Sequence, residues 1–308
     1  GIKTYAFSKG DTFLYDNQLD VIYQQMLSEI SLSKIQTALS HLIQQGALYQ
    51  VENKYFLKEI YDTELSVSNH IKRLIVPMDT RENEILNLIE RAEFDLGIEY
   101  TEKQREAILR ALSSSISVIT GGPGTGKTTV ISGLLYVYSK LHKIDLTLES
   151  ASEDILLVAP TGRASRRMQA VMNMKAMTIH RALGYNYDGQ FYYNDNIQLP
   201  QDLIVIDEAS MIDIFLADNL FKSIPAHTQV IIVGDEDQLP SVGPGYVLGD
   251  IIASNHIPVI RLKEIHRQAK NSNIISLAQV VNEQRVEDTD FDSKEDIKFM
   301  NLEASKII

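Results

Sequence analysis

The chain has 308 residues, of which 44% are hydrophobic and 23% charged, a composition typical of a globular protein with two or three domains. It contains no cysteine, which excludes disulfides and thiolate metal sites, and no apolar run approaches the roughly 20 residues of a membrane helix. The formal net charge of −12 argues against a nucleic-acid-binding protein unless basic residues gather locally. Together these features indicate a cytoplasmic protein without a membrane segment.

Residues 1–78 are predicted to form a small accessory domain. Ser33 is expected to cap a helix that ends at Gln45, and a hairpin over 47–57 and a second helix over 59–74 follow. This order of elements is winged-helix-like, and such domains often bind DNA. Because the expected recognition helix carries few basic side chains, a protein-contact or spacer role is at least as well supported.

A break at 77–79 separates this domain from a second one, expected over 79–263. A helix is predicted over 80–95, and another begins after Thr101. Gln104 follows Thr101 at the spacing of a helix capping box, and its amide could instead pair with the adenine edge of a nucleotide. The spacing alone favours the cap.

Residues 121–128 fill the pattern G-x-x-x-x-G-K-[ST] between an apolar run, 116–120, and a segment that is expected to be helical, 130–139. This is the strand, loop and helix of a P-loop, in which backbone N–H groups cradle phosphates at the positive end of a helix. Lys127 is expected to reach the β- and γ-phosphates of ATP, and Thr128 to place its hydroxyl on Mg²⁺. The expected nucleotide-binding residues of the loop are Gly122, Pro123, Gly124, Thr125, Gly126, Lys127, Thr128 and Thr129.

A second apolar strand, 155–159, ends in a polar turn that begins a basic segment. Residues 159–181 include no Asp or Glu but five basic side chains, Arg163, Arg166, Arg167, Lys175 and Arg181. Such a basic strip on an acidic protein indicates nucleic-acid binding, although charge runs are more often solvated helix faces. The strip lies where open α/β sheets bind ligands. The expected DNA-binding residues are Pro160, Thr161, Gly162, Arg163, Thr178 and His180.

Residues 185–199 contain a cluster of aromatic side chains. The five rings belong to Tyr185, Tyr187, Phe191, Tyr192 and Tyr193. Turn signals at 188–189 and 194–196 predict a β-hairpin inserted into the sheet domain. The rings either pack on their own domain or form a projecting pin, since aromatic faces stack on any base.

Two further apolar strands, 203–206 and 229–233, are each followed by polar residues. Asp207 at the tip of the first is expected to hold Mg²⁺ through its water shell, and Glu208 to orient or deprotonate the water that attacks the γ-phosphate. The second leads into a loop rich in glycine and proline. There, Gln238 either reaches the γ-phosphate or forms part of an ordinary turn.

Together, these motifs resemble those of superfamily 1 helicases, specifically the RecD-like branch, over about residues 96–285. The matching segments, from motif I to the start of motif IV, are 121–129, 159–165, 178–184, 207–210, 233–245 and 265–268. The resemblance implies an α/β fold, the RecA-like parallel sheet of a P-loop NTPase with an inserted β-hairpin, preceded by the winged-helix-like α+β domain. It also implies that Gln104 recognises adenine and that Arg267 reaches the γ-phosphate from a second motor domain.

Members of this family close two RecA-like domains on ATP and step along single-stranded DNA from 5′ to 3′. The resemblance therefore implies ATP and Mg²⁺ as cofactors, single-stranded DNA and a forked duplex as partners, a monomer, and a role in DNA repair or recombination. The second motor domain would begin at 264–308, where nothing matches motifs V and VI, and the chain begins with Gly1. We therefore expect a fragment that binds ATP but hydrolyses little of it alone.

The alternative from another functional class is a P-loop nucleotide switch that grips nucleic acid or a partner without unwinding. An RNA substrate is a lesser alternative, because grooves that follow the backbone recognise phosphates more than sugars. ATP turnover stimulated by single-stranded DNA would favour the motor over the switch.

Overall fold

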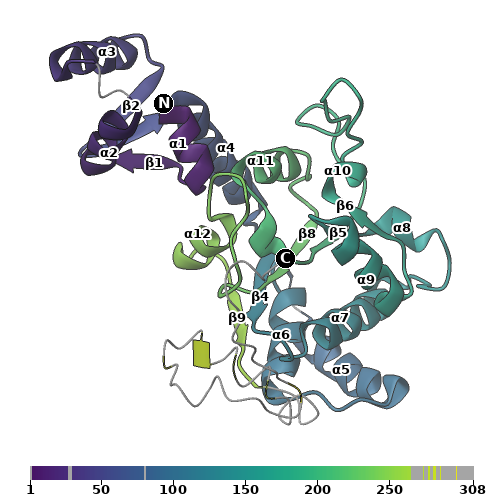
Figure 1. Ribbon diagram of the computed structural model, residues 1–308. Coiled ribbons are helices and arrows are strands. Elements are labelled where there is room, and N and C mark those ends of the chain that lie inside the picture. Colours follow the sequence, from purple (N-terminus) through teal and green to yellow (C-terminus); the bar gives the residue numbers. More distant parts are fainter. Residues whose placement is uncertain are drawn as a thin grey trace.

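The computed structural model describes residues 2–26, 30–79 and 81–264, and the single residues 273, 277, 280, 281, 285 and 296. The described residues form a small N-terminal unit and a larger unit built on a parallel sheet (Figure 1). Arg267 and most of the predicted third domain lie outside them. Within the described part, no helix is both long and apolar enough to span a membrane.

The N-terminal unit combines helices with an antiparallel three-stranded sheet of strand order β1-β3-β2. Its elements in chain order are α1 (Ile2–Lys9), β1 (Phe13–Tyr15), α2 (Asp16–Met26), α3 (Leu32–Gln44), β2 (Leu48–Val51), β3 (Lys54–Leu57) and α4 (Lys58–Leu74). Leu14, Leu19 and Ile22 are buried in its core. The predicted order of helix, hairpin and helix is confirmed, and Glu52 in the hairpin turn adopts a left-handed conformation.

The start of α3 differs from the prediction. Ser31, not Ser33, occupies the N-cap position, and its side chain makes no capping hydrogen bond within the described structure. Ser33 lies in the first turn, where its carbonyl accepts a hydrogen bond from Thr37 Oγ1 at 2.9 Å. The prediction of a Ser33 cap is wrong, because the helix begins at Leu32 and the sequence offers two serines of equal capping propensity.

The larger unit is a six-stranded sheet of order β6-β5-β7-β8-β4-β9, in which every neighbouring pair is parallel. Its elements are α5 (Glu82–Leu96), α6 (Glu102–Leu112), β4 (Ile116–Gly121), α7 (Lys127–His142), α8 (Ala151–Asp154), β5 (Ile155–Ala159), α9 (Gly162–Met172), β6 (Ala176–Thr178), α10 (Ile179–Ala182), β7 (Leu203–Ile206), the 3₁₀ helix η1 (Ala209–Met211), α11 (Ile214–Lys222), β8 (Gln229–Gly234), α12 (Val247–Ala253) and β9 (Val259–Leu262). The four predicted strands are present as β4, β5, β7 and β8. This is the parallel α/β fold that the sequence implies.

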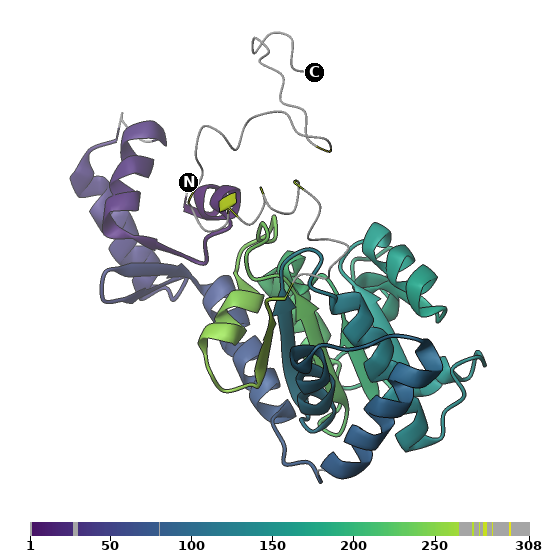
Figure 2. The same ribbon diagram turned by 90° about the horizontal axis from the view of Figure 1, so that it is seen from below.

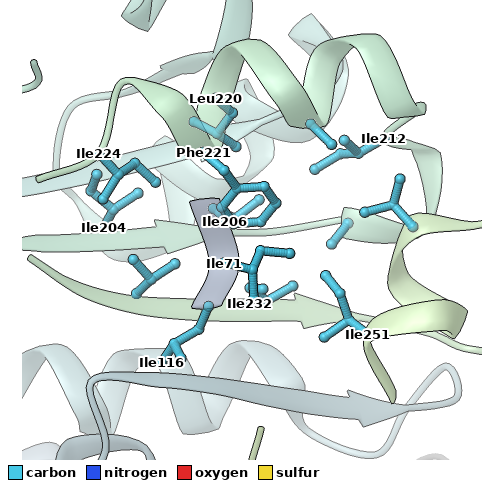
Figure 3. Close-up of a cluster of buried hydrophobic side chains, with 14 of the residues drawn as sticks. Ile71, Ile116, Ile204, Ile206, Ile212, Leu220, Phe221, Ile224, Ile232 and Ile251 are labelled. Carbon is cyan, nitrogen blue, oxygen red and sulfur yellow. The ribbon is translucent and has the colours of Figure 1, made fainter. Parts of the chain in front are cut away.

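The central strands are buried on both faces, which explains their continuous aliphatic sequences. Along β7, Ile204 and Ile206 belong to one core, and Leu203 and Val205 to the other. Figure 3 shows the first core, which Ile71 of α4 enters. Figure 2 shows α4 extending from the N-terminal unit along this flank of the sheet.

Residues 185–199, all of which the structure describes, contain no strand, so the predicted β-hairpin is wrong. Asparagine side chains accept hydrogen bonds from backbone N–H groups that would pair with a neighbouring strand in a hairpin. Asn186 Oδ1 accepts from the N–H groups of Asp188 and Gln190, and Asn194 Oδ1 accepts from Asn196 N–H. The segment is instead a loop of successive turns.

The rings of this loop are divided between packing and exposure. Phe191 and Tyr193 pack against the core of the sheet domain, as the packing alternative expected. Tyr185, Tyr187 and Tyr192 are exposed. The loop therefore exposes three of its rings, while the other two attach it to the domain.

Candidate nucleotide-binding site

The loop between β4 and α7 is shaped by glycine. Gly124 and Gly126 adopt φ angles of +79° and +85°, a left-handed conformation that disfavours side chains. At Gly121, a Cβ atom would lie 2.6 Å from the carbonyl oxygen of Leu262 in β9, so only glycine lets the two strands pack this closely. The structure therefore places the predicted P-loop at the start of α7, where helix N–H groups attract anions.

A cavity of about 690 Å³ opens beside this loop, within the size range of ligand sites. Its walls come from the P-loop, from the carboxyl ends of β7 and β8, from α9 and from the residues before α6. The lining residues are Ile98, Glu99, Gly122, Pro123, Gly124, Gly126, Lys127, Thr128, Thr129, Arg167, Asp207, Glu208 and Gln238. The structure thus brings predicted residues of three separate motifs into one site. Thr125 is buried beneath the loop, where its hydroxyl donates to Gly122 O at 2.8 Å.

Lys127 is held within the loop. Its Nζ donates hydrogen bonds to the carbonyl oxygens of Gly121 and Gly122, the latter at 3.1 Å. Burial lowers the pKa of Lys127, and the nearby carboxylates of Asp235, Glu208 and Asp207 oppose that shift. The ammonium group is therefore partly desolvated and suited to an anionic ligand.

Asp207 and Glu208 follow the buried end of β7. Burial raises the pKa of Asp207, and a hydrogen bond at 2.9 Å from Glu208 N–H to Asp207 Oδ1 opposes the shift. Glu208 adopts a left-handed φ of +55°, which is uncommon for a residue with a side chain and concentrates at functional sites. The backbone turn thus lets both adjacent acids line the cavity.

The donors present fit magnesium. The Thr128 hydroxyl and the Asp207 carboxylate line the same cavity, and Mg²⁺ prefers oxygen ligands, usually one or two carboxylates with phosphate oxygens and water. A divalent cation would also favour the ionised form of Asp207, whose burial favours the neutral one.

Gln104 forms the predicted cap and also contacts the P-loop. Its Oε1 accepts from Thr101 N–H at 3.0 Å, and its own N–H donates to Thr101 Oγ1 at 3.3 Å, so the capping box is confirmed. Its Nε2 donates to Thr125 O at 3.2 Å. The side chain is 1% exposed and lies outside the cavity lining, so its recognition of adenine stays a prediction.

Gln238 lies in a loop that is anchored at three points. The N–H of Glu236 donates to Thr120 Oγ1 of β4 at 3.2 Å, and its carboxylate pairs with Arg261 of β9 at 2.9 Å. Further along, Gly245 N–H donates to the Gly10 carbonyl oxygen of the N-terminal unit at 3.1 Å. The loop that carries Gln238 to the cavity therefore connects the sheet with the N-terminal unit.

The predicted DNA-binding residues surround the start of α9 and α10. Thr161 and Thr178 are N-caps, accepting hydrogen bonds from the N–H groups of Ala164 and Arg181, each at 3.2 Å. The exposed ring of His180 packs on Tyr185 and Phe191. The other members, Pro160, Gly162 and Arg163, lie at or beside the same turn. Contact of all six with DNA stays a prediction.

Arg167, Ile98 and Glu99 line the cavity, although the sequence did not single them out. The sequence grouped Arg167 with the basic strip. From the sequence alone, Arg167 cannot be distinguished from its neighbour Arg166. Which of the two side chains faces the cavity depends on the rotation of α9 about its axis, and that rotation depends on how the helix packs against the sheet.

Comparison with known proteins identifies relatives of this chain. The AAA domain family matches residues 104–244. The ATP-dependent RecD2 DNA helicase of Deinococcus radiodurans is 32% identical over 251 residues, 81% of this chain and 33% of that one. The RecBCD enzyme subunit RecD of Haemophilus influenzae is 38% identical over 175 residues, 50% of this chain and 26% of that one.

Among solved structures, the Pif1 helicase of Candida albicans matches 63% of this chain and 46% of its own, with 21% identity and a TM-score of 0.46. The chain spans about a third or less of the length of the two RecD relatives. The order of its motifs and its likeness to these relatives show that the chain belongs to the RecD-like branch of the superfamily 1 helicases.

Proposed function

We propose that residues 79–263 are the first motor domain of an ATP-dependent DNA helicase, that 1–78 are an accessory domain and that 264–308 begin a second motor domain. The observation that carries this proposal is the cavity in which Lys127, Asp207 and the loop of Gln238 meet at the carboxyl edge of the sheet. We further propose that the protein acts in the cytoplasm as a monomer, in DNA repair or recombination.

The side chains of the cavity suit ATP hydrolysis. Thr128 and Asp207 would hold Mg²⁺, which neutralises phosphate charge when bound. Lys127 would release its loop carbonyls and bind the phosphates instead. Glu208, which lines the same cavity, would orient or deprotonate the attacking water, and Gln238 would contact the γ-phosphate.

Coupling to DNA is proposed from the basic strip and the exposed rings of 185–199. Arg163, Arg166 and Lys175 are exposed on the same unit as the cavity. The name of one relative, a DNA helicase, supports DNA as the substrate. Single-stranded DNA and a forked duplex are proposed from the family resemblance. Movement from 5′ to 3′ is proposed from the family resemblance.

ATP turnover with and without single-stranded DNA tests the proposal, measured on the full natural polypeptide that contains this chain. We expect stimulation by DNA, greater than by an RNA of matched sequence, and loss of turnover in Lys127→Ala and Glu208→Gln. Glu208→Gln should still bind ATP, because it removes the base and keeps the phosphate contacts. Equal turnover with and without oligonucleotide would contradict coupling.

The alternative, a nucleotide switch without translocation, is favoured by one contact. The hydrogen bond from Gly245 to Gly10 gives the loop of Gln238 a direct path to the N-terminal unit. A switch predicts that ATP tightens or weakens DNA binding while turnover stays slow and unstimulated. The turnover assay, together with measurements of DNA binding in the presence of a non-hydrolysable ATP analogue, distinguishes the two functions.

A further inference from the structure

Arg167 differs from the other arginines of α9 by facing the nucleotide cavity. Of the described arginines of this helix, only Arg167 lines it; Arg163 and Arg166 do not. Because successive residues of an α-helix point about 100° apart, adjacent arginines face different surroundings. The arginines of α9 therefore face different parts of the molecule, although they are neighbours in the basic strip.

Arg167 lines the cavity that also contains Lys127 and Asp207. α9 follows β5, and β5 pairs with β7, whose carboxyl end leads into Asp207. The guanidinium therefore shares that cavity with the two groups expected nearest the last phosphates of ATP.

The guanidinium is available for a ligand. Among the described residues, Arg167 makes no hydrogen bond or ion pair, although the carboxylates of Asp207 and Glu208 line the same cavity. A guanidinium presents N–H donors in a planar fork that matches the oxygens of a phosphate. Its donors remain free beside the P-loop.

We propose that Arg167 binds the terminal phosphate of ATP from within the same domain as the P-loop. This inference rests on the proposed function and names a residue beyond the P-loop and the two acids. Because ADP lacks that phosphate, Arg167 makes the site prefer the triphosphate. The preference would operate before any second domain closes on the nucleotide.

Calorimetric titration of the full natural polypeptide in Mg²⁺, without nucleic acid, tests the inference. The titrants are ADP and a non-hydrolysable ATP analogue. Arg167→Ala should weaken binding of the analogue by about 10- to 100-fold, the range for a lost hydrogen bond to a charged group, and leave ADP affinity within about threefold. Arg167→Lys should fall between, because it keeps the charge and loses the fork.

Arg110→Ala is the control, because it removes an exposed guanidinium of α6 that does not line the cavity. Its affinities for ADP and for the analogue should equal those of the wild type. Retained ADP affinity in Arg167→Ala shows that the variant is folded with an intact P-loop.

Two results would overturn the inference while leaving the proposed function in place. One is wild-type affinity of Arg167→Ala for the analogue, and the other is an equal loss for both nucleotides. If the wild type binds neither nucleotide, the proposed function fails together with the inference.

Discussion

The two faces of the six-stranded sheet are covered by helices of different origin. One face packs on α5, α6, α7 and α9, all of which belong to the sheet unit and surround the P-loop. The other face packs on α11 and α12 and on the C-terminal half of α4, a helix that begins in the N-terminal unit. The nucleotide face is thus covered by helices of the sheet unit itself, whereas the opposite face is covered in part by α4, which begins in the N-terminal unit.

α4 serves both units along its length. Near its start, Tyr61 packs its ring on Tyr49 and Phe56 of the N-terminal sheet. Val67, Ile71 and Leu74, at helical spacing, are buried in the core beneath the large sheet. The proposed division at residue 78 therefore assigns to the N-terminal domain a helix half that completes the core of the sheet unit.

This shared face contains a cavity. A cavity of about 470 Å³ lies between α4 and the segment that includes α12, lined in part by Val67, Ile71 and Ile251. The cavity marks a junction between two units, and the bond from Gly245 to Gly10 crosses between the same two units. The N-terminal unit is therefore packed onto the sheet unit rather than tethered to it.

The largest expected effect is that of Leu74→Ala. Leu74 is fully buried where α4 meets the large sheet, so its truncation should lower the free energy of unfolding by about 2–5 kcal/mol. Leu65→Ala is the control, because Leu65 lies in the same helix and is 52% exposed; it should change stability by no more than about 0.5 kcal/mol. Urea denaturation measures both, and equal small losses would show that α4 is dispensable to the sheet.

Gly133→Ala tests the nucleotide face. A Cβ at this position in α7 would lie 2.1 Å from Tyr100 Oη and 2.9 Å from Ile108 Cδ1. Overpacking should therefore cost about 1–3 kcal/mol despite the better helix propensity of alanine. Gly162→Ala is the control, since a Cβ there meets nothing within 4 Å. A higher midpoint temperature of thermal unfolding in both variants would mean that α7 and Tyr100 are less closely packed than the structure shows.

The P-loop and the central strands could be predicted because each signal is local. The aliphatic runs that form β7 and β8 lie between polar turns; Asp207 directly follows β7, and the loop after β8 carries Gln238. A parallel sheet then brings these strand ends to one edge whatever the details of packing. The fold and most of the site follow from this arrangement.

The remaining features depend on contacts that the sequence does not record. The helical spacing of α4 predicts an apolar face but not that two different sheets share it. The turn signals in 185–199 are those of a hairpin, yet Asn186 and Asn194 bind the backbone locally and produce a loop. Arg166 and Arg167 are equivalent in sequence until α9 is oriented against the sheet.

Arg73→Ala should have a smaller effect on the shared face, at about 1–2 kcal/mol. Arg73 Nη2 donates to the carbonyl oxygens of Phe221 and Ile224, at 3.2 and 2.8 Å, where α11 ends. A cation at that end of a helix also interacts favourably with the helix dipole. Hydrogen exchange should show α4 and α11 losing protection together, while exposed Lys72→Ala leaves both unchanged. Loss in α11 alone would contradict the coupling of the two helices.

Tyr100→Phe should have the smallest effect near neutral pH and a distinct one in alkali. The Tyr100 side chain is buried against α7, and its hydroxyl has no hydrogen-bond partner among the described residues, so its removal should change stability by less than about 1 kcal/mol. Burial, with a contribution from Glu93, raises the pKa of Tyr100 to about 12. The unfolded chain, with a pKa of about 10, therefore releases this proton first as the pH rises.

Stability consequently falls between about pH 10 and pH 12, because there the folded state binds the proton that the unfolded state has lost. Phenylalanine has no such proton, so Tyr100→Phe should lose stability less steeply over this interval. Buried Tyr138, whose pKa is also raised by burial, is present in both proteins and cancels in the comparison. Urea denaturation at about pH 9 and about pH 11 gives the two slopes. Identical slopes would mean that the Tyr100 hydroxyl is solvated, and that water reaches the nucleotide face beside α7.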